Sequence, residues 1–240
     1  MEKEQGLIID WVSMPTYNTI MCVAVGAALC SLAVMAKNMI QKKEIEPIGW
    51  SLNLGVLGLI LFLTGLHMTL TWPLAKYFPF DNIVFGEPSL AFGTILLAFS
   101  IYFWKKAKML TKVENPLIPL GLIGKQFKFF FYGFGLAMIA IAIAGVTYQL
   151  FAAPPEEPIS GEFADYPLVE AIFISALWAF TGVASLLMPS VFNYFSKGKK
   201  EITSTLKTAY VLVYGLGIVF LLFGAFNYFT HIGLIVNTMA

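Results

Sequence analysis

The sequence predicts an all-α membrane protein, one bundle of six transmembrane helices over residues 1–240. Its residues are 58% hydrophobic and only 12% charged, and this charged fraction is about half that of an average soluble domain. Apolar runs of roughly 18 residues or more recur along the chain, and a helix of about 20 residues crosses a bilayer. The runs are continuous rather than alternating, which favours spanning helices over spanning strands.

The apolar runs give the expected position of each span. Residues 6–13 are too short to cross, and Trp11 beside Asp10 indicates a segment lying at the interface. Trp50 and Trp72 stand near the two ends of the second run, where aromatic side chains anchor helices at the membrane surface. The six spans are expected at about 15–36, 48–74, 89–104, 129–151, 168–195 and 209–236.

Three connections between spans are long enough to have a structure of their own. Residues 75–88 mix aromatic, acidic and proline residues and are expected to form a loop folded onto the membrane surface. In residues 113–128, Pro116 and Pro119 are expected to break any long helix and leave a short interfacial piece, with a re-entrant segment as the alternative. Residues 152–167 form a loop rich in proline and acidic residues.

The lysines predict the orientation of the bundle. All 15 basic residues are lysines, and 13 of them follow the first, third and fifth spans. Because cytoplasmic loops of membrane proteins carry an excess of basic residues, these loops are expected in the cytoplasm of a cell-membrane protein. Both termini and the loops 75–88 and 152–167 then lie outside.

Glycines suggest how the helices pack. Gly58 and Gly65 lie seven residues apart in the second span, and Gly217 and Gly224 are spaced likewise in the sixth. A spacing of seven places small residues on one helix face, where they allow close helix contact. The recurrence of glycine-bearing helices is also consistent with three consecutive helical hairpins.

The sharpest chemical clue is a pair of histidines. His67 and His231 are the two histidines of the chain, and they fall in the second and sixth spans. Both lie toward the outer ends of helices that run in the same direction, so a similar depth is expected. Two neutral imidazoles facing each other at one depth could ligate a b-type haem from both sides. The protein would then be an electron-transfer membrane subunit with its haem near the outer face.

Two other interpretations of these residues stay open. Because ionisable groups in lipid are costly, Glu87 and Glu170 join the histidines as candidates for a functional site. His67, His231, Glu87 and Glu170 could together hold a transition metal ion through nitrogen and oxygen ligands. Alternatively no cofactor is bound, and the histidines and carboxylates are structural or proton-linked.

The remaining features leave the function class open, including whether the protein is an enzyme. Alternatives to electron transfer are a non-catalytic accessory subunit of a larger membrane complex and a proton-linked transporter of small solutes. The acidic loop 152–167 could dock an external redox partner, although such loops are usually only solvated. The chain has no arginine and no nucleotide-binding fingerprint, and we expect the bilayer, not nucleic acid, as its partner.

Two segments resemble an uncharacterised family of multi-span proteins. They are TGLHMTLTWPL around His67 and NIVFGEPSLAFG around Glu87. The family is a domain of unknown function from archaea and bacteria. The resemblance implies a prokaryotic membrane protein and no particular activity, and it makes His67 and Glu87 the matching positions to test.

Overall fold

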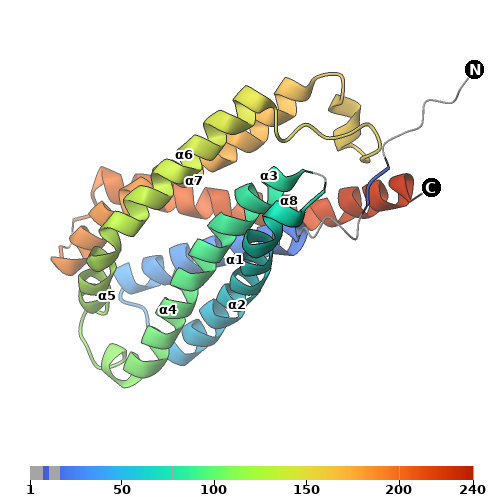
Figure 1. The fold of residues 1–240 in the computed structure, drawn as a ribbon. Coiled ribbons are helices and arrows are strands. Elements are labelled where there is room, and N and C mark those ends of the chain that lie inside the picture. Colours follow the sequence, from blue (N-terminus) through green and yellow to red (C-terminus); the bar gives the residue numbers. More distant parts are fainter. Residues whose placement is uncertain (1–7, 11–16, 77, 200, 240) are drawn as a thin grey trace, which may run out of the picture.

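The computed structural model describes residues 8–10, 17–76, 78–199 and 201–239. It is 82% helical, and within the described residues six helical stretches are long and apolar enough to cross a membrane (Figure 1). The longer helices are α1 (Asn18–Ile40), α2 (Pro47–Thr71), α4 (Glu87–Leu110), α5 (Leu117–Gly124), α6 (Lys128–Tyr148), α7 (Pro167–Ser196) and α8 (Ser204–Thr238). The short ones are η2 (Trp72–Leu74), α3 (Pro79–Asp81), η3 (Asn82–Gly86), η4 (Lys125–Phe127) and η5 (Ser160–Phe163).

Local sequence accounts for where several helices begin. The Glu46 side chain accepts hydrogen bonds from the backbone N–H groups of Ile48 and Gly49 and so caps α2. Thr203 caps α8 by accepting from Leu206 N at 3.3 Å. Pro47 and Pro167 occupy the first positions of α2 and α7, where a missing N–H costs nothing.

The connections gather at two opposite ends of the bundle. The loops after α1, α4 and α7 lie together at one end, which we call the lysine-rich end (Figure 1). The other end, which we call the opposite end, contains the described parts of both termini and the connections α2–α4 and α6–α7. This alternation confirms the predicted number of crossings. The predicted interfacial segment 6–13 lies outside the described residues except for 8–10.

Helices pack in three close antiparallel pairs: α2 with α4, α6 with α7, and α1 with α8. This arrangement corrects the expected grouping into consecutive hairpins. The closest partners are shifted by one helix along the chain, and the last helix closes the arrangement by packing on the first. Contact between pairs is smaller and is found mainly between α1 and α2 and between α7 and α8.

Each of the three pairs has two glycines in reciprocal contact. A Cβ on Gly58 would lie 3.1 Å from Gly93 O, and one on Gly93 would lie 2.9 Å from Gly58 O. The pairs α6–α7 and α1–α8 repeat this geometry at Gly135 with Gly182 and at Gly217 with Gly26. Small residues let two backbones approach in this way in membranes. The predicted glycine faces of α2 and α8 are thus confirmed.

Two predicted connections are helical instead. Residues 79–86 form α3 and the π-helical turn η3, which run directly into α4, so the helical stretch that contains the third predicted span is 79–110. Residues 117–127 form α5 and η4, which continue into α6, so the stretch that contains most of the fourth predicted span is 117–148. Pro116 precedes α5 and Pro119 lies in its first turn, where proline is tolerated. The helix of the first predicted span, α1, extends to Ile40.

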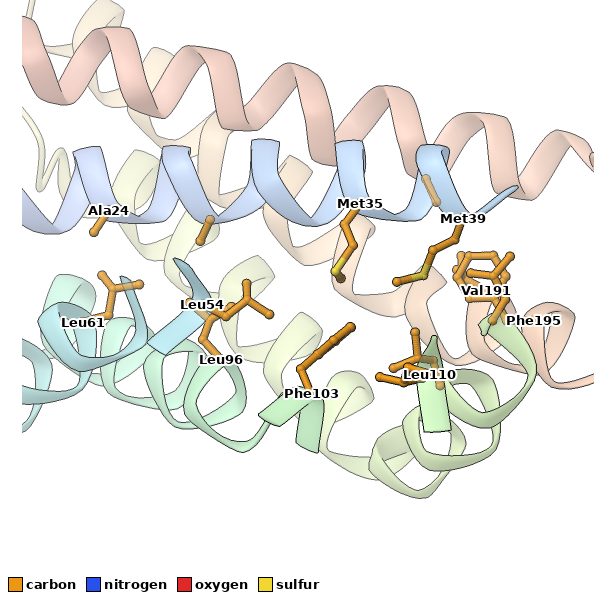
Figure 2. Close-up of a cluster of buried hydrophobic side chains, with 14 of the residues drawn as sticks. Ala24, Met35, Met39, Leu54, Leu61, Leu96, Phe103, Leu110, Val191 and Phe195 are labelled. Atoms are coloured by element: carbon orange, nitrogen blue, oxygen red, sulfur yellow. The ribbon is translucent and has the colours of Figure 1, made fainter. Parts of the chain in front are cut away.

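The main core lies between α1 and the α2–α4 pair. Figure 2 shows Met35 and Met39 of α1 pointing toward Phe103 and Leu110 of α4, and all four are at least 93% buried. The outer surfaces of the helices are apolar as well, with only 22% to 39% of each candidate spanning window buried inside the bundle. Apolar side chains face inward and outward alike, which is what a multi-pass membrane protein requires.

Candidate functional site

A cavity of about 800 Å³ lies between the three helix pairs. Its volume falls in the range of about 300–1,000 Å³ that is typical of ligand pockets. Residues of α1, α4, α7 and α8 line it along most of their length, together with residues of α5 and of the first half of α6. Aromatic side chains dominate the middle of its wall, among them Phe85, Phe92, Phe134, Trp178, Phe220 and Phe223.

At the opposite end, the cavity wall contains a histidine held by two hydrogen bonds. His231 Nδ1 lies 2.9 Å from the Asn227 carbonyl oxygen, so this nitrogen carries the proton and donates it. His231 Nε2 is then an acceptor, and the Asn18 side-chain amide lies 3.4 Å away and can donate to it. The two contacts orient the ring.

Three carboxylates line the same end of the cavity: Asp81, Glu157 and Glu170. Glu170 Oε2 accepts a hydrogen bond from the Ala153 backbone at 2.7 Å, which ties the loop 152–166 to α7. The loop also contacts the end of α8, because the Asn237 side chain donates to Glu156 O at 2.7 Å. This loop therefore covers the mouth of the cavity, and its residues 152–154, 157 and 160 form part of the wall.

His67 lies outside this site. It is exposed and does not line the cavity. Its Nδ1 lies 3.3 Å from the Tyr17 hydroxyl, with the two rings 5.6 Å apart between centroids. Tyr17 and Asn18 are neighbours at the start of α1, so His67 and His231 lie at a similar level along that helix.

The two histidines do not fit a bis-histidine haem site in this arrangement. α1 packs against both α2 and α8, whereas α2 and α8 have hardly any backbone contact with each other. The start of α1 therefore lies between the two rings, with Tyr17 beside His67 and Asn18 beside His231. A porphyrin ligated from both sides needs that space.

The mixed metal site is not assembled either. Within the described residues, no three His, Cys, Asp or Glu side chains gather closely enough to hold a metal ion. Of the four predicted ligands, His231 and Glu170 line the cavity, whereas His67 and Glu87 do not. Glu87 begins α4 and is exposed. The ionisable residues at this end of the cavity thus include His231, Glu170 and Asp81.

Asp81 and Asn18 are site residues that sequence reasoning missed. Asp81 fell in the expected surface loop, but a proline at 79 followed by an acidic residue is a common start of a helix, and α3 begins at Pro79. Asn18 precedes an apolar run, and an asparagine there is a typical helix-start residue. Neither signal indicates that the side chain lines a cavity.

Comparison with known families gives one finding. The model of a family described as a protein of unknown function, DUF981, matches residues 14–233. The chain belongs to the DUF981 family. Membership confirms the resemblance to an uncharacterised family, and the match covers all but the last residues of α8 in the bundle of this DUF981 protein. No curated protein and no solved structure matches the chain.

Proposed function

We propose that this DUF981 protein binds a membrane-soluble molecule with a long apolar chain in its central cavity. The observation that carries the proposal is the cavity itself, about 800 Å³ of space bounded by all three helix pairs, apolar along its middle and polar at its two ends. A purely structural bundle would be expected to close such a space, since protein interiors are close-packed.

The dimensions and lining of the cavity favour a chain-like ligand. On α1 the wall runs from Asn18 to Gln41, which corresponds to about 35 Å of helix at about 1.5 Å per residue. This length is close to the hydrocarbon thickness of a bilayer, about 30 Å. Water finds few hydrogen-bond partners in a space lined by aromatic and aliphatic side chains. An apolar chain needs no such partners and can fill the space.

The bundle offers a route into the cavity from the lipid. α4 has hardly any backbone contact with α6 or α7, so these helices meet through side chains. Aromatic pairs bridge the seam: Phe99 lies 6.4 Å from Phe127, and Phe85 lies 5.9 Å from Trp178, between ring centroids. Rotation of such side chains can admit a ligand without separating the tightly packed glycine pairs.

A matched pair of α7 variants tests the proposal. Thr181 lines the cavity, whereas Val183 is 41% exposed on the outer surface and does not line it. We expect native mass spectrometry of gently extracted protein to show a bound lipid-soluble molecule. Thr181→Trp should reduce its occupancy at least about fivefold, because the indole fills the space, and Val183→Trp should not. Equal occupancy in all three proteins would contradict the proposal.

Transport of the bound molecule is a second candidate, favoured by one observation. The cavity reaches both ends of the bundle, and its opposite end contains the ionisable residues Asp81, Glu170 and His231, as in proton-linked transporters. Flux of the ligand across proteoliposomes that responds to a pH gradient, and loses this response in Glu170→Gln, would support transport. An unchanged response would leave binding alone.

We also propose the orientation in which the lysine-rich end faces the cytoplasm and both termini lie outside, on the basis of the positive-inside rule. Electron transfer through haem stays a prediction without support from the histidine geometry. A role as an accessory subunit is compatible with ligand binding. The acidic loop 152–166 covers the cavity in this structure. We propose this covering role for the loop, and it needs no external redox partner.

A further inference from the structure

The two ends of the cavity have opposite charge. Among the described residues, the wall at the opposite end contains the carboxylates of Asp81, Glu157 and Glu170 and no lysine. At the lysine-rich end the described part of the wall contains Lys37 and Lys207 and no carboxylate. Of the 13 lysines that the structure describes, Lys37 and Lys207 line the cavity and the other 11 do not. The charge of the cavity wall therefore comes from these two positions and not from the lysine-rich surface as a whole.

Both lysines belong to one rigid helix pair. Lys37 lies in the last turn of α1 and Lys207 in the first turn of α8, and the two helices are held together by the contact of Gly26 with Gly217. Lys37 Nζ lies 5.9 Å from the centre of the Tyr210 ring, and Tyr210 also lines the cavity. Cation–π attraction of this kind holds an ammonium near one place.

Within the part of the chain that the structure describes, no ion pair neutralises the positive charge at this end. Among the described residues, neither Lys37 nor Lys207 has a carboxylate within ion-pair distance, and the ion pair between Lys76 and Asp10, at 3.8 Å, lies at the opposite end. Toward the middle of the bundle, the wall next to the lysines is apolar, with Leu32 and Ala33 of α1 and Val213 of α8. The two ammonium groups therefore lie near one end of an apolar cavity.

We propose that the bound molecule is an anionic amphiphile, with a carboxylate or phosphate head against Lys37 and Lys207 and its chain along the aromatic wall. This inference rests on the proposed function. The acidic residues at the other end repel the same head, so the molecule is bound in one orientation. If the lysine-rich end is cytoplasmic, the head lies at the leaflet where anionic lipids concentrate.

The experiment compares ligands that share a chain and differ in the head. Delipidated protein in a neutral detergent is titrated with palmitate, with a lysophosphatidic acid and with the uncharged monoacylglycerol, each with a 16-carbon chain, and binding is read by tryptophan fluorescence and native mass spectrometry. We expect both anionic ligands to bind at least about tenfold more tightly than the monoacylglycerol. Inorganic phosphate up to 10 mM should not compete, since the chain carries most of the affinity.

Two double variants test the lysines. In Lys37→Gln with Lys207→Gln, the anionic ligands should lose about 25-fold in affinity, at about fivefold for each lysine beside an anionic head, while the monoacylglycerol is unaffected. The control is Lys105→Gln with Lys108→Gln on α4, which are exposed and do not line the cavity. It should retain the affinity of the original chain. Thermal unfolding of both variants verifies that the fold is intact.

The outcomes separate this inference from the proposal on which it rests. If charged and uncharged ligands bind with equal affinity and Thr181→Trp blocks them all, the preference for an anionic head group would be overturned, and binding in the cavity would stand. Loss of affinity in the control as large as in the cavity variant would also overturn it, because the general surface charge would then be responsible. Binding of none of the three ligands would overturn both. Competition by inorganic phosphate would show that the lysines bind a free anion, and it would overturn the proposal that the ligand is an amphiphile.

Discussion

Gly217 of α8 and Gly26 of α1 lie backbone against backbone: a Cβ on Gly217 would be 3.1 Å from Gly26 O, and one on Gly26 would be 2.7 Å from Gly217 O. The same reciprocal contact joins Gly58 with Gly93 and Gly135 with Gly182. Three helix pairs of equal construction thus surround the cavity. The rigid contacts lie within the pairs, and the space lies between them.

The α8 helix offers a matched test of this packing. A Cβ on Gly217 would meet α1, whereas one on Gly215, two residues earlier, would meet nothing within 4 Å. We expect Gly217→Val to lower the free energy of unfolding by about 1–3 kcal/mol, because the two backbones must separate. Gly215→Val should change it by less than about 0.5 kcal/mol. Unfolding in SDS, followed by circular dichroism, measures both, and equal effects would contradict the close contact.

Polar bonds reinforce the α2–α4 pair near its lysine-rich end. Ser51 Oγ donates to Ser100 O at 2.9 Å, and Ser100 Oγ donates to Ser51 O at 2.7 Å. Interhelical hydrogen bonds in membranes stabilise by about 0.6 kcal/mol on average. We expect Ser51→Ala and Ser100→Ala each to lower the free energy of unfolding by about 0.5–1.5 kcal/mol.

A double-mutant cycle of the two serines tests whether they act together. Because each hydroxyl bonds the backbone of the other residue, removal of one leaves the other bond in place. The two losses should therefore add within about 0.5 kcal/mol. A coupling energy well above this value would indicate that the contact between the two hydroxyls, 3.4 Å apart, matters more than the bonds to the backbone.

The sequence alone was sufficient for the number of helices that can span a membrane. Long apolar runs are a local signal, and they do not depend on how the helices pack. The glycine faces of α2 and α8 were likewise visible, because a spacing of seven is a property of one helix. Their contact partners could not be predicted, because nothing in the local sequence indicates that Gly217 contacts Gly26, almost two hundred residues away in the chain.

The composition of the site was harder to predict for the same reason. His231 and Glu170 were candidates because ionisable residues in apolar runs are costly, and both line the cavity. Which face of a helix looks inward depends on its crossing with neighbours, so His67 could not be separated from His231. Asp81 was missed because the helix from Pro79 exceeds the length that hydropathy demands of a span.

Labelling of single cysteines tests the proposed orientation. Cys22 and Cys30, both within α1, are first replaced by alanine. Glu162 of the loop 152–166 and Lys199 of the lysine-rich end are exposed and provide the two test positions. In intact cells, a membrane-impermeant maleimide should label Glu162→Cys, and it should label Lys199→Cys only after lysis, since the lysine-rich end is expected in the cytoplasm. The reverse pattern would invert the orientation.

The two histidines should differ in their contribution to stability. His231 donates to Asn227 O and stands next to the Asn18 amide in the partly buried cavity wall. Because Asn227 O also accepts from Thr230 Oγ1, His231→Ala mainly removes the partner of the Asn18 amide, which water reaches poorly. We expect it to lower the free energy of unfolding by about 1–3 kcal/mol. His67 is exposed and contacts Tyr17, and His67→Ala should cost less than about 1 kcal/mol. SDS unfolding measures both changes.

The absorbance spectrum of the dithionite-reduced protein is the control for this interpretation of the histidines. A Soret band that is lost equally in the two variants would contradict the arrangement, because both rings would then ligate one haem.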